Sequence, residues 1–177
     1  HAMRQKNIIY ELIDHIPFID ITVFGKEKMD VIKDEFGDRI KYKDIFNLLI
    51  TVKDVDGNLD VEKTKIKFKN WKKERDLWIS KIIKMIDPKT QLIISDSVPQ
   101  TSSISKELGI KQLNIQHFTW DWLYKSIYGD DEIFRLLNAD YKLNGDFIFP
   151  PLTPVGNLNL HNNYQEINFI VNKNLIN

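Results

Sequence analysis

Residues 91–124 read "QLIISDSVPQTSSISKELGIKQLNIQHFTWDWLY", and this stretch decides the fold. Its apolar run "QLIISDS" predicts a strand buried on both faces. A helix is predicted over "SVPQTSSISKELG", with Ser97 and Gln100 at capping-box spacing and Gly109 at its left-handed end. "IKQLNIQHF" then predicts a second strand, and "TWDWLYKSIYG" a second helix. Two successive strand-to-helix units indicate an α/β domain built on a parallel sheet.

The same alternation of helix and strand patterns extends to both sides of this stretch. Further helices are predicted over 4–16, 26–36, 61–87 and 132–144, and further strands over 18–24, 39–46, 146–151 and 166–173. In the long helix, Trp71 and Trp78 follow the spacing of a buried face, which favours the core over a ligand platform. We therefore expect a Rossmann-like, doubly wound parallel sheet with helices on both sides.

The alternation begins with a helix, whereas the first strand of a doubly wound sheet usually lies near the middle of the sheet. Either the first helix is an N-terminal addition, or the chain is a fragment that lacks its first strand; we favour the fragment. Residues 1–150 are expected to form one domain. The loop-rich segment 151–177 is expected to be a linker toward a further domain.

Composition excludes several classes of function. The net charge of the 177 residues is zero and lysine dominates the basic residues, so a dedicated nucleic-acid surface is not expected. The absence of cysteine excludes disulfides, thiolate zinc sites and thiol nucleophiles. No apolar run approaches the roughly 20 residues of a membrane span, so we expect a cytoplasmic protein. His15 and His161 have no ligand-like spacing, and no metal site is expected.

The turn after the first of the two central strands carries polar residues where a structural turn would be small. Ligands of open α/β sheets bind beyond the carboxyl ends of the strands, and the residues that line the crevice come from these turns. Asp96 is either a general base or hydroxyl acceptor, or a cap for the following helix. The sequence leaves these two interpretations open.

The turn after the second strand, "QHFTWD", is polar and aromatic. His117 either contacts a ligand oxygen or is a surface histidine bonded to backbone. Thr119 is a fair N-cap and Asp121 suits the first turn of a helix, so capping explains part of the pattern. We expect Phe118 and one tryptophan to be buried, while His117, Thr119 and Asp121 face a crevice.

Several residues of this stretch also carry a family resemblance. Asp96 and Pro99 stand at the end of one strand and the start of the next helix, and the following strand ends in Phe118, Thr119, Trp120, Asp121 and Tyr124. This pattern resembles the N-terminal domain of GT-B type glycosyltransferases, especially putative bacterial enzymes related to the N-terminal part of L-arabinokinase. His117 stands where asparagine is usual in that family.

The opening residues "HAMR" resemble the last portion of the family's glycine-rich GHxxGHxxR turn, which gives His1 and Arg4 as matching residues; "HAM" is equally compatible with a vector remnant. Arg4 lies in the first turn of the first helix, where either a bound anion or a frayed end would explain it.

The resemblance implies a nucleotide-sugar-dependent transferase with its active site in a cleft between two domains. This chain would hold the acceptor, and a C-terminal domain of the same protein would hold most of the donor. His1 and Asp96 are then the candidate catalytic bases, and the candidate substrate-binding residues are Arg4, Pro99, His117, Thr119, Trp120, Asp121 and Tyr124. No cofactor or metal is implied, and the isolated chain is expected to be inactive.

Two rival hypotheses remain open. The first is a non-catalytic sugar- or nucleotide-binding module fused to a sugar kinase. The second is a non-enzymatic α/β interaction domain that exposes the aromatic residues of 118–128 to a protein partner. A crevice at the sheet edge with Asp96 near Trp120 would argue against the interaction domain.

Overall fold

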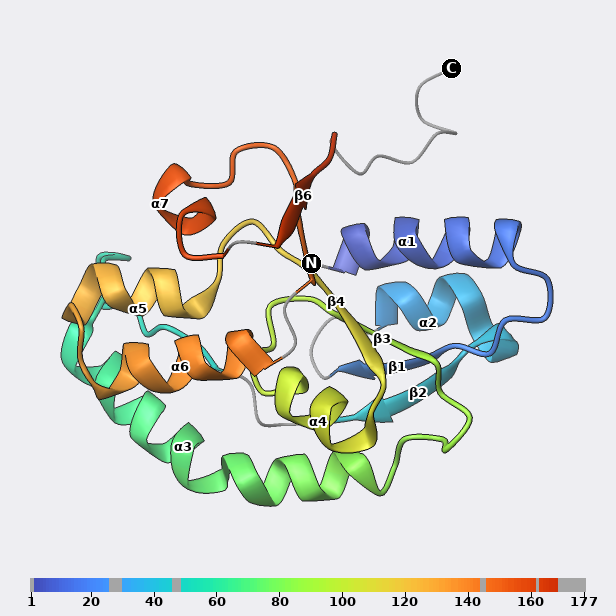
Figure 1. The fold of residues 1–177 in the computed structure, drawn as a ribbon, viewed down its shortest axis with the longest axis horizontal. Helices are drawn as coiled ribbons and strands as arrows, with labels where there is room; N and C mark the ends of the chain where they lie inside the picture. Colours follow the sequence, from blue (N-terminus) through green and yellow to red (C-terminus); the bar gives the residue numbers. More distant parts are fainter. Residues whose placement is uncertain (1, 26–29, 46–48, 144–145, 162, 169–177) are drawn as a thin grey trace. The chain divides into compact units, whose positions relative to one another are not determined.

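The computed structural model describes residues 2–25, 30–45, 49–143, 146–161 and 163–168. The chain divides into two compact units, one of His1–Phe46 with Phe169–Asn177 and one of Asn47–Asn168. Both units combine helices with parallel strands (Figure 1). The predicted α/β class with parallel strands is therefore confirmed.

The first unit is small and contains two strands. Its elements are α1 (Ala2–His15), β1 (Thr22–Gly25), α2 (Asp30–Phe36), the short 3-10 helix η1 (Gly37–Arg39) and β2 (Lys41–Asp44). The two strands pair in parallel, with Val23 opposite Tyr42. Its buried core consists of Ile9, Ile32, Phe36 and Ile40. Apolar residues at helical spacing thus bury one face of each helix, as the sequence predicts.

The second unit contains four strands and most of the helices. Its elements are α3 (Val61–Ile83), β3 (Leu92–Ser95), α4 (Thr101–Leu108), β4 (Lys111–Ile115), α5 (Trp120–Tyr128), α6 (Glu132–Leu143), β5 (Asp146–Phe149), α7 (Val155–Leu158) and β6 (Tyr164–Glu166). The strands lie in the order β3-β4-β5-β6, and all neighbours are parallel. The segment from residue 151, expected as a linker, contributes α7 and β6 to this unit.

Helices of the second unit cover one face of its sheet. Crossovers between parallel strands are almost always right-handed, so strands added in chain order place their helices on the same side. On that side, Nε2 of Gln112 in β4 donates to Oγ of Ser102 in α4. The ring of Tyr141 in α6 lies 5.8 Å from that of Phe147 in β5. A doubly wound sheet would require the strand order to reverse, and the four described strands do not reverse.

The expectation that "QLIISDS" is buried on both faces is wrong. The helices of this unit cover one face of the sheet, and in β3 this is the face of Ser95, whose Oγ lies 2.8 Å from Oγ1 of Thr101 in α4. Leu92 is 47% exposed and Ile94 36% exposed, on the face opposite to Ser95. The face of Leu92 and Ile94 is the one that these helices leave uncovered, and an apolar run alone does not encode which face is covered.

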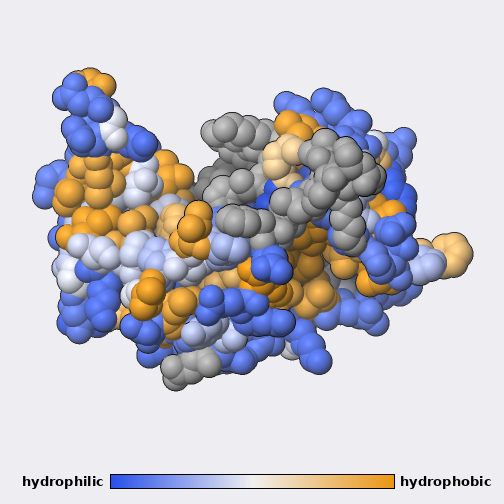
Figure 2. Space-filling model, turned by 90° about the horizontal axis from the view of Figure 1, so that it is seen from above, coloured by the Kyte–Doolittle hydropathy of each residue, from blue (hydrophilic) through white to orange (hydrophobic). Residues whose placement is uncertain are grey.

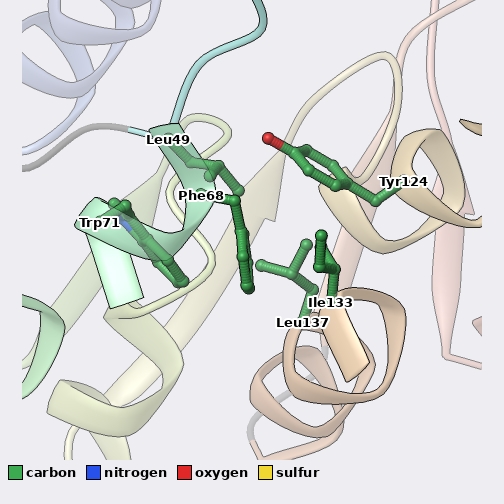
Figure 3. Packing of buried hydrophobic residues seen from close by; sticks show 6 residues of the cluster. All are labelled: Leu49, Phe68, Trp71, Tyr124, Ile133 and Leu137. Carbon is green, nitrogen blue, oxygen red and sulfur yellow. The ribbon is translucent and has the colours of Figure 1, made fainter. Parts of the chain in front are cut away.

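The core of the second unit lies where α3 meets α5 and α6. Figure 3 shows its members pointing toward one another from these three helices and from the segment before α3: Leu49, Phe68, Trp71, Tyr124, Ile133 and Leu137. The rings of Phe68 and Tyr124 lie 5.7 Å apart. Trp71 and Trp78 are both buried, which confirms the prediction that their spacing reflects a core face.

A buried ion pair joins three helices of this unit. Arg75 of α3 donates to both carboxylate oxygens of Asp140 in α6, and its Nη2 also donates to Oγ of Ser103 in α4 at 2.8 Å. Both charged side chains are largely buried. The bidentate geometry and the hydroxyl partner satisfy the pair, so it fixes how α3, α4 and α6 meet.

The start of α4 differs from the predicted capping box. α4 begins at Thr101, and no side-chain oxygen caps its N-terminus. Ser97 instead adopts a left-handed conformation with φ of 62°, and its hydroxyl donates to Oδ1 of Asp96 at 3.2 Å. A capping residue needs extended backbone, which the turn at Ser97 does not provide. The predicted left-handed end at Gly109 is confirmed, with φ of 66°.

Candidate functional site

The turns that follow β3 and β4 lie at the same edge of the sheet and contact each other. The two strands are parallel neighbours, with Ser95 paired to Asn114. Nε1 of Trp120, in the first turn of α5, donates to the backbone oxygen of Ser97 at 2.7 Å. The polar turn with Asp96 and the aromatic turn with His117 therefore form one continuous surface at the carboxyl edge.

Hydroxyl groups hold the turn after β3 in shape. Oγ of Ser95 and Oγ1 of Thr101 both donate to the backbone oxygen of Val98, at 3.1 and 2.6 Å. The left-handed backbone of Ser97 costs roughly 1–2 kcal/mol relative to an ordinary conformation. Such strain is typical of functional turns that the surrounding structure holds in place. Asp96 is half-buried in this turn, and Pro99 is buried beneath it.

The turn after β4 presents a histidine and two partly covered aromatic rings. His117 is exposed, whereas Phe118 and Trp122 are half-buried. The ring of Phe118 lies 5.8 Å from Trp120 and 6.3 Å from Trp122. This part of the edge therefore offers an imidazole beside a small aromatic surface, which suits the apolar face of a ring-shaped ligand.

A third turn, after β5, completes the edge. Leu152 in this turn has φ of 69° and is 86% exposed, and Val155 at the start of α7 is 72% exposed. Gly156 lies against the aromatic turn, because a Cβ added to it would be 3.0 Å from Nε1 of Trp122. Figure 2, which views the molecule from the side of α7 in Figure 1, shows hydrophobic residues exposed in patches among hydrophilic ones.

An open cavity of about 530 Å³ lies at the carboxyl ends of β5 and β6. The described residues that line it are Pro151, Glu166, Ile167 and Asn168. Ligand sites of open parallel sheets occupy this kind of position. The cavity adjoins the third turn, because Pro151 directly precedes Leu152.

Beneath the turns after β4 and β5 lies a cluster of polar side chains, which we call the buried polar cluster: the buried Thr119, Asp121, Asn157 and His161 and the half-buried Asn138. Oδ1 of Asn157 accepts from both the backbone N–H and the hydroxyl of Thr119, at 2.7 and 2.6 Å. Nε2 of His161 lies 3.2 Å from Oγ1 of Thr119. The turn after β4 and the segment after β5 are thereby joined.

Asp121 is the charged member of the buried polar cluster. Its Oδ1 accepts from the backbone N–H of Trp122, and its Oδ2 accepts from Nδ2 of Asn138, each at 2.8 Å. Burial alone would raise the pKa of Asp121. The interactions with His161, Thr119 and Asn138 outweigh this effect and hold the pKa below its ordinary value. The carboxylate is therefore ionised and fully occupied with partners inside the fold.

Three of the candidate substrate-binding residues are fully buried. Thr119 and Asp121 are fully buried, so the expectation that they face a crevice is wrong. Their oxygens bond to the buried polar cluster. Tyr124 is fully buried in the core, and its hydroxyl donates to the backbone oxygen of Ile50 at 3.3 Å. Burial raises the pKa of Tyr124, as expected for a phenol inside a core.

The remaining candidates lie at three kinds of position. Asp96, Pro99, His117 and Trp120 belong to the two turns that meet at the carboxyl edge. Arg4 lies in the first turn of α1, in the first unit, and is half-buried. His1 lies outside the described residues. The structure therefore brings four of the predicted site residues together in two contacting turns, with Pro99 buried and the other three at least partly exposed.

Sequence reasoning missed Asn138, Asn157 and His161. Asn157 and His161 act over separations of 38 and 42 residues. Asn157 and His161 come from a loop-like stretch, in which apolar residues recur with neither the helical nor the strand period. A polar residue in such a stretch gives no sign that it will be buried, so no local signal identified these contacts.

No family model, no curated protein and no solved structure matches this chain. Within the described residues, no three histidine, aspartate or glutamate side chains gather as metal ligands would. Over the same residues, every helix is too short or too polar to cross a bilayer.

Proposed function

We propose that this chain is the acceptor-binding domain of a nucleotide-sugar-dependent glycosyltransferase of the GT-B type. The observation that carries the proposal is the 2.7 Å bond from Trp120 to Ser97, which joins the turn bearing Asp96 to the turn bearing His117. It supports a shared surface at the carboxyl edge of a parallel sheet, where α/β proteins bind their ligands.

In the proposed reaction, Asp96 is the general base. Its carboxylate takes the proton of an acceptor hydroxyl as the hydroxyl oxygen attacks the anomeric carbon of the donor sugar, and the nucleoside diphosphate leaves. Oγ of Ser97 donates to Oδ1 of Asp96, which orients the carboxylate. His117 would hydrogen-bond the acceptor from the neighbouring turn. The donor would be held mainly by a second domain.

Aromatic side chains support a sugar acceptor. Phe118 and Trp122 are half-buried beside His117, so part of each ring stays accessible. The C–H faces of a pyranose ring pack on such surfaces, while its hydroxyls reach the flanking polar groups. Thr119, Asp121 and Tyr124 act from beneath, as positioning residues that hold this turn.

The proposal is tested by titrating the chain with a panel of methyl glycosides and recording saturation-transfer NMR. We expect at least one glycoside to bind and Asp96→Asn to weaken its binding tenfold or more. Asp56→Asn, an exposed carboxylate in a distant turn, is the matched control and should change nothing. Failure of the whole panel to bind, or equal effects of both variants, would contradict the proposal.

A second measurement tests whether this chain alone can activate the nucleotide-sugar donor. Incubated with UDP-, dTDP- and GDP-hexoses and a bound acceptor, the isolated chain is expected to release no nucleotide above background. Nucleotide release by these 177 residues alone would contradict the role of acceptor domain, because donor activation would then reside in this chain.

A further inference from the structure

The third turn combines a strained backbone position with exposed apolar side chains. Leu152 is held in the left-handed region, which leucine rarely adopts, and its side chain is almost wholly in solvent. Val155, three residues later, is also exposed. Neither side chain contributes to the core, so packing of the fold does not explain why apolar residues stand here.

The exposed apolar residues are continuous with the proposed acceptor surface. Gly156 touches the indole of Trp122, and Asn157 bonds to Thr119, so α7 packs directly against the aromatic turn. The open cavity lined by Pro151, Glu166, Ile167 and Asn168 adjoins the third turn, because Pro151 directly precedes Leu152. The edge thus presents Asp96 at the turn after β3, a histidine beside aromatic rings at the turn after β4, and two exposed aliphatic side chains at the third turn.

The distance between the ends of β3 and β5 sets a minimum length for a ligand that covers this edge. Neighbouring strands lie about 4.8 Å apart, so the ends of β3 and β5 are separated by about 10 Å. A ligand that contacts both Asp96 and Leu152 must therefore be longer than one hexose ring. Its polar end would lie at the turns of Asp96 and His117, and its apolar part would lie along the third turn.

We propose that the acceptor is amphiphilic: a hydroxyl-bearing head group joined to an apolar chain or ring system that lies over Leu152 and Val155 toward the cavity at Pro151. This inference rests on the proposed function, and it names the class of acceptor. Water leaves the exposed leucine and valine when the apolar part binds, which favours such an acceptor over a free sugar.

The test compares two probes that share a head group, n-octyl β-D-glucoside below its micelle concentration and methyl β-D-glucoside. The chain is labelled with 5-fluorotryptophan, so each of its four tryptophans gives a ¹⁹F resonance that single Trp→Phe variants assign. The resonance of Trp122 reports binding at the carboxyl edge. The resonances of the buried Trp71 and Trp78 of α3 report nonspecific effects of the probe on the whole chain. We expect the octyl glucoside to shift Trp122, with or without Trp120, and to leave Trp71 and Trp78 unshifted, with at least tenfold higher affinity than the methyl glucoside.

The double variant Leu152→Ser/Val155→Ser should lose that tenfold advantage and keep the methyl glucoside affinity. Leu77→Ser, at an exposed leucine of α3, is the matched control and should keep the advantage. Equal affinities of the two probes for the unmodified chain would overturn the amphiphilic acceptor and leave the proposed function standing. The amphiphilic acceptor would also be overturned if the double variant kept the tenfold higher affinity for octyl glucoside, or if the probe shifted the resonances of all four tryptophans. Should another glycoside bind in the panel above, its octyl and methyl forms replace the glucosides.

Discussion

Nε2 of His161 lies 3.5 Å from Oδ1 of Asp121, and both side chains are buried. The two residues come from segments 40 positions apart, one in α5 and the other in the loop before β6. Their contact places a carboxylate, an imidazole and three further polar side chains beneath the carboxyl edge. The architecture of the edge therefore depends on groups that no ligand needs to touch.

Asp121→Asn is expected to destabilise the chain by about 3 kcal/mol, because breaking a buried charge network costs this much. Asn138 and the backbone N–H of Trp122 both donate to Asp121, and an amide would turn a donor toward one of them. Urea unfolding measures the change. Asp130→Asn removes an exposed pair with Arg135 and should cost less than about 1 kcal/mol. Similar losses in both variants would contradict the role of the network.

The contribution of Asp121 to stability should depend on pH. Its pKa is lowered in the folded chain, so the unfolded chain binds the proton more readily. The stabilisation is then present above the ordinary carboxyl pKa, near 4, and is lost as pH falls through the lowered value. The difference in unfolding free energy between the native chain and Asp121→Asn should narrow between pH 6 and pH 3. A constant difference over this range would refute the assignment.

Trp120→Phe should loosen the contact between the first two turns. The ring volume is largely kept, but the bond from Nε1 to the backbone oxygen of Ser97 is lost, at a cost of about 1–2 kcal/mol. We expect glycoside binding to weaken as well, because the turn bearing Asp96 is no longer fixed. Trp122→Phe is the matched control for stability. An unchanged stability and affinity of Trp120→Phe would show that the bond does not organise the edge.

Leu152→Gly should stabilise the chain although it removes an apolar side chain. A left-handed backbone destabilises the folded chain by roughly 1–2 kcal/mol when the residue is leucine, and glycine avoids this cost. The greater freedom of glycine stabilises the unfolded chain and so offsets about 0.5–1 kcal/mol of the gain. The expected net gain is about 0.5–1 kcal/mol by thermal or urea unfolding. The same variant should bind the octyl glucoside more weakly. A loss of stability would indicate that Leu152 packs in solution.

The sequence predicted the elements of the fold well where the pattern is local. The helical spacing of Trp71 and Trp78 identified a core face, and Gly109 marked the left-handed end of α4. The adjacency of the turns at Asp96 and Trp120 also followed from the alternation of strands and helices. These features depend on nearest neighbours along the chain and on one rule of parallel sheets.

Features set by distant partners were not predictable in the same way. Ser97 has the residue type of a helix cap, but its left-handed backbone points it to Asp96. Thr119 and Asp121 look like exposed capping residues until Asn157 and His161 cover them. Leu92 and Ile94 look buried until the helices of the second unit pack on the opposite face of β3. In each case a long-range contact overrides the local preference.

The contacts of Asn157 and His161 also set where this folding unit can be shortened. A chain ended at Pro150 would keep the strands β3, β4 and β5. It would nevertheless remove the acceptor for the N–H and hydroxyl of Thr119 and the imidazole beside Asp121. The buried carboxylate would then lose a partner while remaining inside the protein. For expression, deletion or fusion, the second unit must therefore extend at least through His161, well beyond the point where its sequence pattern turns loop-like.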